Sequence, residues 1–284
     1  MAWEYEILFD ARERTPLEIA SEEWAREERT CVKPGQMGYR TCTTKAGPRL
    51  EAEIYPIFGQ SEEAKARQAK KNLTKEKMQA YNEERSRRYL TQLIDANFSG
   101  QDIHLTLTYS MPQKFDRARR DVKNFLKRLR RIREKRGLPE LKYIYAIEGG
   151  DGIDEKRVHV HIIMNSGINR EELEQIWQKG YANADRLQPT MEGLEAIARY
   201  ISKQQTGKNR HKWSGSKNLK KPKVRRSDTK ISNARVKRIA RGFEQEAKPI
   251  MEKLYPGYDH VRTVVRYSDI IDGVYIRVLM RKRE

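Results

Sequence analysis

Cysteines and long apolar runs are scarce in this 284-residue chain. The two cysteines, Cys31 and Cys42, are too few for a disulfide framework or a thiolate metal site, and they favour a reducing compartment. No stretch approaches the ~20 consecutive apolar residues that a membrane-spanning helix needs. The first ten residues also lack the basic-then-apolar pattern of a secretory signal. We therefore expect a soluble, cytoplasmic protein with no membrane partner.

Acidic residues are outnumbered by basic ones, with 40 Asp+Glu against 59 Lys+Arg and a net charge of +19. A bias of this size is typical of proteins that bind a polyanion, although a solvated basic surface produces the same count. Residues 203–243 hold fifteen Lys or Arg and one acidic residue, Asp228, so much of the charge is local. Trp213 stands among these charges and could stack on a base. The residues expected to contact nucleic acid in this stretch are Lys212, Trp213, Lys217, Lys220, Lys221, Arg225 and Arg226.

Composition and pattern divide the chain into five segments. We expect a β-rich accessory region in 1–60, a basic helical segment in 61–97, the main domain in 98–206, a basic DNA-contacting segment in 207–232, and a C-terminal helix and hairpin in 233–284. The sequence gives no indication of what residues 1–95 do.

The main domain has the clearest secondary-structure pattern. "IHLTLTY" (103–109) alternates apolar and polar residues at the period of a strand, and residues 115–136 repeat apolar residues at the period of a helix. The remaining segments complete the order βαββαβ followed by a helix, which predicts an α+β, ferredoxin-like antiparallel sheet. In that arrangement the first and third strands are neighbours, and helices cover one sheet face. Thr106 and Thr108 would then line the other face, which is open to a ligand. They are expected to contact nucleic acid there, although ordinary strand hydroxyls fit the pattern equally well.

Two histidines stand two residues apart in the third predicted strand, "RVHVHIIM" (157–164). Side chains two apart on a strand share a face, so His159 and His161 could bind one divalent cation, with Glu148 at the end of the preceding strand as a carboxylate ligand. Asp151 and Asp154, in the intervening turn, are weaker candidates for that ligand. Taken alone, this spacing more often reflects two half-exposed polar residues than a metal site.

The last helix of the domain, predicted over 191–204, carries a tyrosine away from its apolar stripe. Leu194, Ile197 and Ile201 define the stripe, and helical geometry turns Tyr200 well away from its centre. Lys203 lies three residues on, along the same flank as Tyr200. Taken alone, this pair is also typical of an ordinary surface.

Together, "IHLTLTY", Glu148, "HVH" and "YISK", in this order and spacing, resemble the rolling-circle replication initiators of the HUH endonuclease superfamily, such as those of small bacterial phages and integrated elements. The resemblance covers about residues 95–220. As in initiators, the tyrosine follows the histidines, here by 39 residues. Some initiators carry two tyrosines on this helix, whereas 191–204 contains only Tyr200, which favours a single-tyrosine enzyme.

The resemblance implies metal-dependent nicking and joining of single-stranded DNA through a 5′-phosphotyrosyl intermediate. It makes Tyr200 the nucleophile, Lys203 an assistant near the phosphate, and Glu148, His159 and His161 the ligands of Mn²⁺ or Mg²⁺. The expected partners are single-stranded or hairpin origin DNA, a helicase and a DNA polymerase of the bacterial host. A host helicase is expected because the chain lacks the G-x-x-x-x-G-K-[ST] loop of an ATP-driven one.

Two other functions remain open at this point. One is a single-strand DNA transposase of the same superfamily, although such enzymes are usually compact and this chain has long flanking regions. The other is a non-catalytic protein that binds single-stranded nucleic acid on a ferredoxin-like sheet. Such proteins stack bases on aromatic side chains of the central strands, whereas the predicted face here offers His and Thr.

Overall fold

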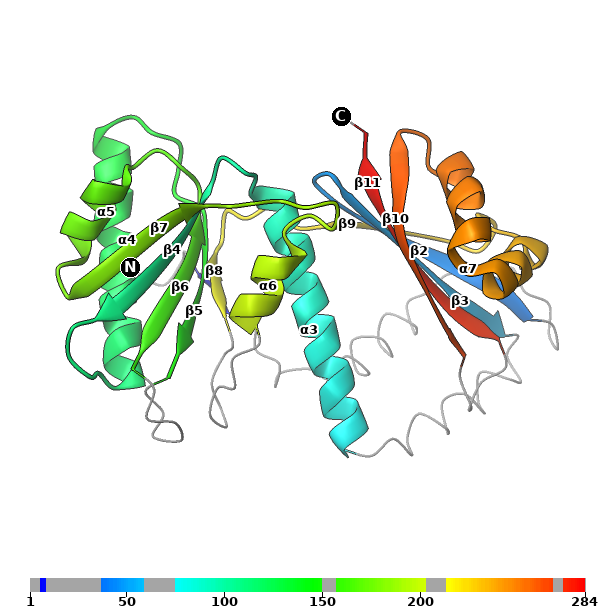
Figure 1. Ribbon diagram of the computed structural model, residues 1–284, viewed down its shortest axis with the longest axis horizontal. Helices are drawn as coiled ribbons and strands as arrows, with labels where there is room; N and C mark the ends of the chain where they lie inside the picture. Colours follow the sequence, from blue (N-terminus) through cyan, green and yellow to red (C-terminus); the bar gives the residue numbers. More distant parts are fainter. Residues whose placement is uncertain are drawn as a thin grey trace. The chain divides into compact units, whose positions relative to one another are not determined.

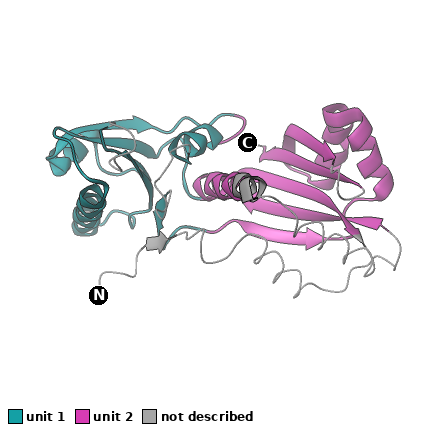
Figure 2. Ribbon diagram, turned by 90° about the horizontal axis from the view of Figure 1, so that it is seen from below, with its two compact units in different colours: residues 1–13, 97–190, 194–220 teal, residues 14–96, 191–193, 221–284 magenta. Residues whose placement is uncertain are grey.

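A computed structural model describes residues 6–8, 37–58, 75–149, 157–202, 213–267 and 273–283. The chain divides into two compact units, coloured separately in Figure 2. The first unit contains residues 1–13, 97–190 and 194–220, and the second contains 14–96, 191–193 and 221–284. Both combine helices with antiparallel sheets, which confirms the predicted α+β class. Within the described ranges, no helix has the length and apolar character needed to cross a membrane.

The first unit contains the predicted βαββαβ pattern (Figure 1). Its elements are β4 (Ile103–Tyr109), α4 (Phe115–Lys135), β5 (Tyr143–Glu148), β6 (His159–Met164), α5 (Arg170–Trp177), β7 (Gly180–Arg186) and α6 (Glu195–Ser202). Two short strands, β1 (Glu6–Leu8) and β8 (Ser214–Ser216), extend the sheet to the order β1-β8-β5-β6-β4-β7. The prediction that the first and third strands are neighbours is confirmed, because β4 pairs with β6.

Alternation along the strands explains which sheet face is packed. Leu105, Leu107 and Tyr109 of β4 are buried in one hydrophobic core together with apolar residues of α4 and α5. α5 begins where the sequence predicts, because the side chain of Asn169 accepts a hydrogen bond from the backbone N–H of Glu172.

The opposite face of this sheet, called the site face below, is less open than predicted. Ile144 and Ile163 point to it and are fully buried. α6 lies on the site face, across the sheet from α4 and α5 (Figure 1). The expectation of a face left open to a ligand is therefore corrected, since the sequence does not show that the chain folds back over part of it.

The second unit joins segments that are far apart in the sequence. Its elements are β2 (Met37–Ala46), β3 (Arg49–Phe58), α3 (Lys75–Asn97, to residue 96 in this unit), β9 (Lys223–Ser227), α7 (Asn233–Leu254), β10 (Tyr258–Tyr267) and β11 (Val274–Lys282). The sheet order is β10-β11-β3-β2-β9. The predicted C-terminal helix and hairpin are thus present, and apolar residues of α7 share a core with β3 and β11.

A buried arginine near the end of α4 joins two loops of the first unit. The Arg133 side chain is 1% exposed, and its guanidinium donates to the carbonyl oxygens of Pro139 at 2.8 Å and Ser166 at 2.9 Å. Burial also lowers the pKa of Arg133.

We predict that Arg133→Met lowers the free energy of unfolding by about 2–4 kcal/mol, because buried carbonyl groups lose their hydrogen-bond donors. Urea denaturation of the full chain measures the change. Arg131→Met, at an exposed position of the same helix, is the matched control. Equal shifts of the two midpoints would contradict the structural role of Arg133.

Candidate active site

Strand pairing arranges the predicted site residues in lateral rows on the site face. The rows follow from the antiparallel register of β5, β6, β4 and β7, in which directly paired residues point to the same side. One row contains Glu148, His159, Thr108 and Tyr181, and the next contains Ala146, His161, Thr106 and Asn183. Residues from four strands are therefore brought together around the two histidines.

Each histidine of the pair is oriented by a threonine of β4. Thr106 Oγ1 lies 3.3 Å from Nδ1 of His161, and Thr108 Oγ1 lies 3.2 Å from Nδ1 of His159. With Nδ1 engaged, the Nε2 atom of each ring remains the nitrogen available to a ligand. The sequence prediction placed both threonines on this face, but it missed their contacts with the histidines. The prediction that β4 and β6 are neighbours was the signal that could have revealed them.

His161 has an unsatisfied nitrogen that faces a carboxylate. Its side chain is 3% exposed, and its Nε2 atom is buried without a hydrogen-bond partner. The nearest Glu148 oxygen lies 3.6 Å from Nε2, which is too long for a hydrogen bond. Burial lowers the pKa of His161, and the nearby Glu148 carboxylate opposes this effect without cancelling it. Nε2 of His161 therefore faces the Glu148 carboxylate in a buried position.

Tyr200 lies against the buried histidine. Its ring centroid is 5.0 Å from that of His161, and the two ring planes meet at 78°. Ala198 and Ile201 of α6 are fully buried, whereas Tyr200 is 51% exposed. The helix is thus anchored by its apolar stripe and presents the phenol on the flank that the helical spacing predicts.

The site contains a third histidine, His104, to which the sequence analysis assigned no role. Its ring stacks on His161 at a centroid distance of 5.5 Å and lies 6.3 Å from the ring of Tyr200. Burial, reinforced by the neighbouring His161, lowers the pKa of His104 to about 4. The signal for this residue was present, because His104 alternates with Thr106 and Thr108 on one face of β4.

The donor chemistry of these residues suits a divalent cation, although the described residues form no closed three-ligand cluster. No group of three His, Cys, Asp or Glu side chains within the described ranges is arranged to hold a metal ion. Glu148 and His161 nevertheless face each other, and the orphaned Nε2 atom supplies one donor. His159 stands beside Glu148 in the same row. A carboxylate and two imidazoles are ligands that Mn²⁺ accepts, so the residues present fit such an ion.

Comparison with known protein families bears on this part of the chain. Residues 102–205 match the family model of the replication-associated protein ORF2, called the replication-associated family below. No curated protein and no solved structure matches the chain. The match covers less than half of the chain, and it associates the first unit with DNA replication.

The match to the replication-associated family contains all the site residues assembled above, from His104 to Tyr200. Lys203 also falls within it, but Lys203 lies outside the described residues, as do Asp151, Asp154 and Lys212.

The basic stretch beyond the family match agrees with the sequence prediction only in part. Trp213 is 3% exposed, so the expectation that its indole stacks on a base is corrected. Trp213 belongs to the first unit and directly precedes β8, and its local sequence does not show that the fold buries it. The basic residues expected to contact nucleic acid are exposed, namely Lys217 and Lys220 in the first unit and Lys221, Arg225 and Arg226 in the second.

The low pKa of His104 predicts an acid-sensitive fold in metal-free protein. Because the folded-state pKa of about 4 lies below the ordinary value of 6.5, the contribution of His104 to stability is complete above pH 6.5 and is lost as the pH falls toward 4. The full shift corresponds to about 3 kcal/mol at most. We expect His104→Asn to reduce the loss of stability between pH 6.5 and 4, measured by urea unfolding in EDTA. A pH dependence identical to that of the unsubstituted protein would contradict this prediction.

Proposed function

We propose that this protein initiates rolling-circle replication by cutting and rejoining single-stranded DNA with Tyr200 as the nucleophile. The observation that carries the proposal is the contact between an exposed tyrosine and a buried histidine, inside the span that matches the replication-associated family. The proposed site lies in the first unit, and its substrate is single-stranded or hairpin origin DNA.

The proposed reaction exchanges one phosphoester bond for another. The phenol oxygen of Tyr200 loses its proton and bonds to the phosphorus, while the bond to the 3′ oxygen breaks and that oxygen takes up a proton. The products are a 5′-phosphotyrosyl link and a free 3′-OH that a host polymerase can extend. In the reverse reaction a 3′-OH attacks the phosphotyrosine, which rejoins the strand and releases the phenol.

Residues of the chain supply the rest of the proposed site. Glu148, His159 and His161 would hold Mn²⁺ or Mg²⁺, which when bound polarises the non-bridging phosphate oxygens. Thr106 and Thr108 contact Nδ1 of the two imidazoles, which leaves the Nε2 atoms to bind the ion. Lys203, close to Tyr200 in the sequence, would stabilise the phenolate, since a free phenol has a pKa near ~10. A host helicase would separate the strands, in the cytoplasm of a bacterial cell.

The test uses single-stranded oligonucleotides that tile the replicon encoding the chain, incubated with the full-length protein and Mn²⁺ or Mg²⁺. A strand labelled at its 3′ end should transfer its label to the protein on a denaturing gel. The same strand labelled at its 5′ end should give a shorter, free product. Mass spectrometry should locate the DNA on Tyr200, and EDTA should prevent the reaction.

Two outcomes would contradict the proposal. The opposite label polarity would show a 3′ linkage and a different chemistry. Binding without cleavage in every metal would favour a non-catalytic protein that binds single-stranded nucleic acid.

A further inference from the structure

An exposed tyrosine shares a row of the site face with the proposed metal ligands. Tyr181 is 80% exposed, although an aromatic side chain is usually mostly covered in a folded domain. It pairs with Thr108, which in turn pairs with His159. Neighbouring strands lie ~4.8 Å apart, which places Tyr181 roughly 10 Å from His159 along the row. That ring is therefore available to a strand of DNA that crosses the sheet from the histidines.

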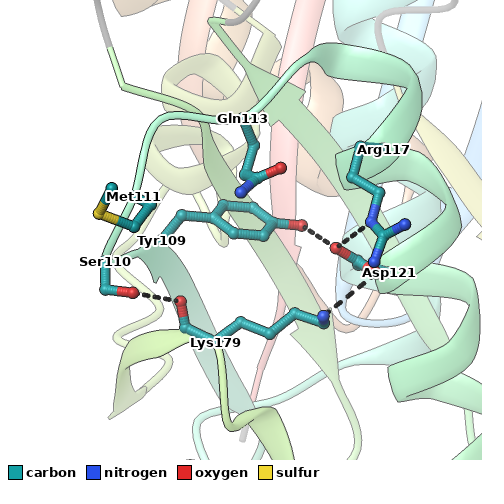
Figure 3. A pocket seen from close by; sticks show the side chains of 7 residues that line it. All are labelled: Tyr109, Ser110, Met111, Gln113, Arg117, Asp121 and Lys179. Atoms are coloured by element: carbon teal, nitrogen blue, oxygen red, sulfur yellow. Dashed lines mark hydrogen bonds and ion pairs between the residues drawn. The ribbon is translucent and has the colours of Figure 1, made fainter.

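A pocket of about 380 Å³ lies at the end of β4 (Figure 3). Its lining is Tyr109, Ser110, Met111, Gln113, Arg117, Asp121 and Lys179. One of its lining residues, Lys179, is two residues before Tyr181 in the sequence. The volume is at the lower end of the ~300–1,000 Å³ that small-ligand sites usually have. All of these residues belong to the first unit.

Gly180 lies between Lys179, which lines the pocket, and Tyr181, which lies on the site face. Its φ is +150°, and a Cβ atom there would lie 2.2 Å from the carbonyl oxygen of Thr108. Only glycine allows this close approach. Lys179 directly precedes β7 and lines the pocket, while Tyr181 in β7 pairs with Thr108 and lies on the site face. The carbonyl oxygen of Lys179 accepts a hydrogen bond from the backbone N–H of Ser110 at 3.0 Å, which holds this turn against β4.

The free polar groups of the pocket are mainly hydrogen-bond donors. The buried Asp121 carboxylate lies 3.5 Å from Lys179 Nζ and 3.5 Å from Arg117 Nε, and it accepts a hydrogen bond from the Tyr109 hydroxyl at 3.3 Å (Figure 3). Both cations form ion pairs with this carboxylate and keep N–H groups for a ligand. Two cations and one anion leave the cluster with a surplus of positive charge. This chemistry suits a phosphate group, with Asp121 positioning the two donors.

We propose that the start of β7 binds a nucleotide that flanks the cleaved phosphate, with its base stacked on Tyr181 and an adjacent phosphate bound by Lys179 and Arg117. The proposal rests on the function proposed above, because it assumes that the substrate strand passes His159. Aromatic stacking and cationic side chains are the usual combination for single-stranded DNA, and stacking tolerates any base. The subsite would therefore hold the strand in place without reading its sequence.

The test measures equilibrium binding, so that it can be interpreted even if no cleavage occurs. The full chain in EDTA is titrated into a fluorescein-labelled, mixed-sequence 20-nucleotide strand at several salt concentrations. Tyr181→Ala should weaken binding about tenfold, whereas Tyr181→Phe should restore it, because the phenyl ring still stacks. On a strand of abasic residues, Tyr181→Ala should have no effect.

The phosphate contact has a different signature. Lys179→Gln should weaken binding to both strands and reduce the slope of log K against log salt by about 0.7, the value for one phosphate contact on a single strand. Arg117→Gln should act in the same way. Lys127→Gln and Arg131→Gln remove the same charges from exposed positions of α4 and are the matched controls.

Several outcomes would overturn the subsite. One is an equal loss of binding in the Lys179 and Lys127 variants, and another is an unchanged affinity in Tyr181→Ala. Inorganic phosphate is the third arm of the test. Suppose that Lys179→Gln weakens the binding of inorganic phosphate but leaves the affinity for the DNA strand unchanged. The pocket then binds free phosphate and not DNA. Failure of the adduct assay with these binding results intact would instead count against the proposed catalysis alone.

Discussion

Replacing Tyr200 with phenylalanine is expected to abolish the covalent protein–DNA adduct. The substitution removes the oxygen that would bond to phosphorus, and no side-chain atom of phenylalanine can replace it. The ring itself, which packs against His161 at 5.0 Å, is retained, so the site should keep its shape. We expect the adduct to fall below detection on a denaturing gel, while the affinity for a single-stranded oligonucleotide in EDTA changes less than twofold.

Tyr267→Phe is the matched control for this experiment, because it removes a hydroxyl from an exposed tyrosine that has no place in the proposed site. It should leave the amount of adduct unchanged. An undiminished adduct in Tyr200→Phe would eliminate Tyr200 as the nucleophile, and peptide mapping would then identify the residue that carries the DNA.

The second large effect is expected at His161. His161→Ala removes the buried Nε2 atom that faces Glu148, and with it one of the proposed metal ligands. We expect the initial rate of adduct formation to fall at least 100-fold at millimolar Mn²⁺. Binding of Mn²⁺ to the full chain, followed by calorimetry, should weaken in parallel.

Thr106→Val separates positioning from ligation. Valine has nearly the shape of threonine but cannot bond to Nδ1 of His161, so the imidazole loses its orientation and keeps its donor atom. We expect the affinity for Mn²⁺ to fall about tenfold and the rate to recover at saturating metal, unlike His161→Ala. If His161→Ala binds Mn²⁺ as tightly as the unsubstituted protein, His161 is not a ligand and the proposed metal site is wrong.

The strands and helices around the site could be predicted because local patterns determine them. β4 and α4 have the predicted bounds to within one residue, since strand alternation and helical spacing are both strong there. The pairing of β4 with β6 could be predicted from the order of the elements alone. Together these patterns predict that His159, His161 and the two threonines share one face.

What could not be predicted depends on contacts between residues distant in the sequence. Local spacing predicts an exposed Trp213 among lysines, but the tertiary fold buries it. The packing of Tyr200 on His161 depends on how α6 returns to the sheet, and no periodicity encodes that return. Nor does the sequence reveal that Arg133 is buried, because long cationic side chains are exposed in most helices.

α6 presents a single tyrosine to the site, and this sets a limit on stoichiometry. Under the proposed chemistry one chain can carry one DNA end at a time. A second cut made before the first end is released must then come from another copy of the protein. Adducts should therefore never exceed one strand per polypeptide, and any intermediate with two covalently held ends should contain two polypeptides.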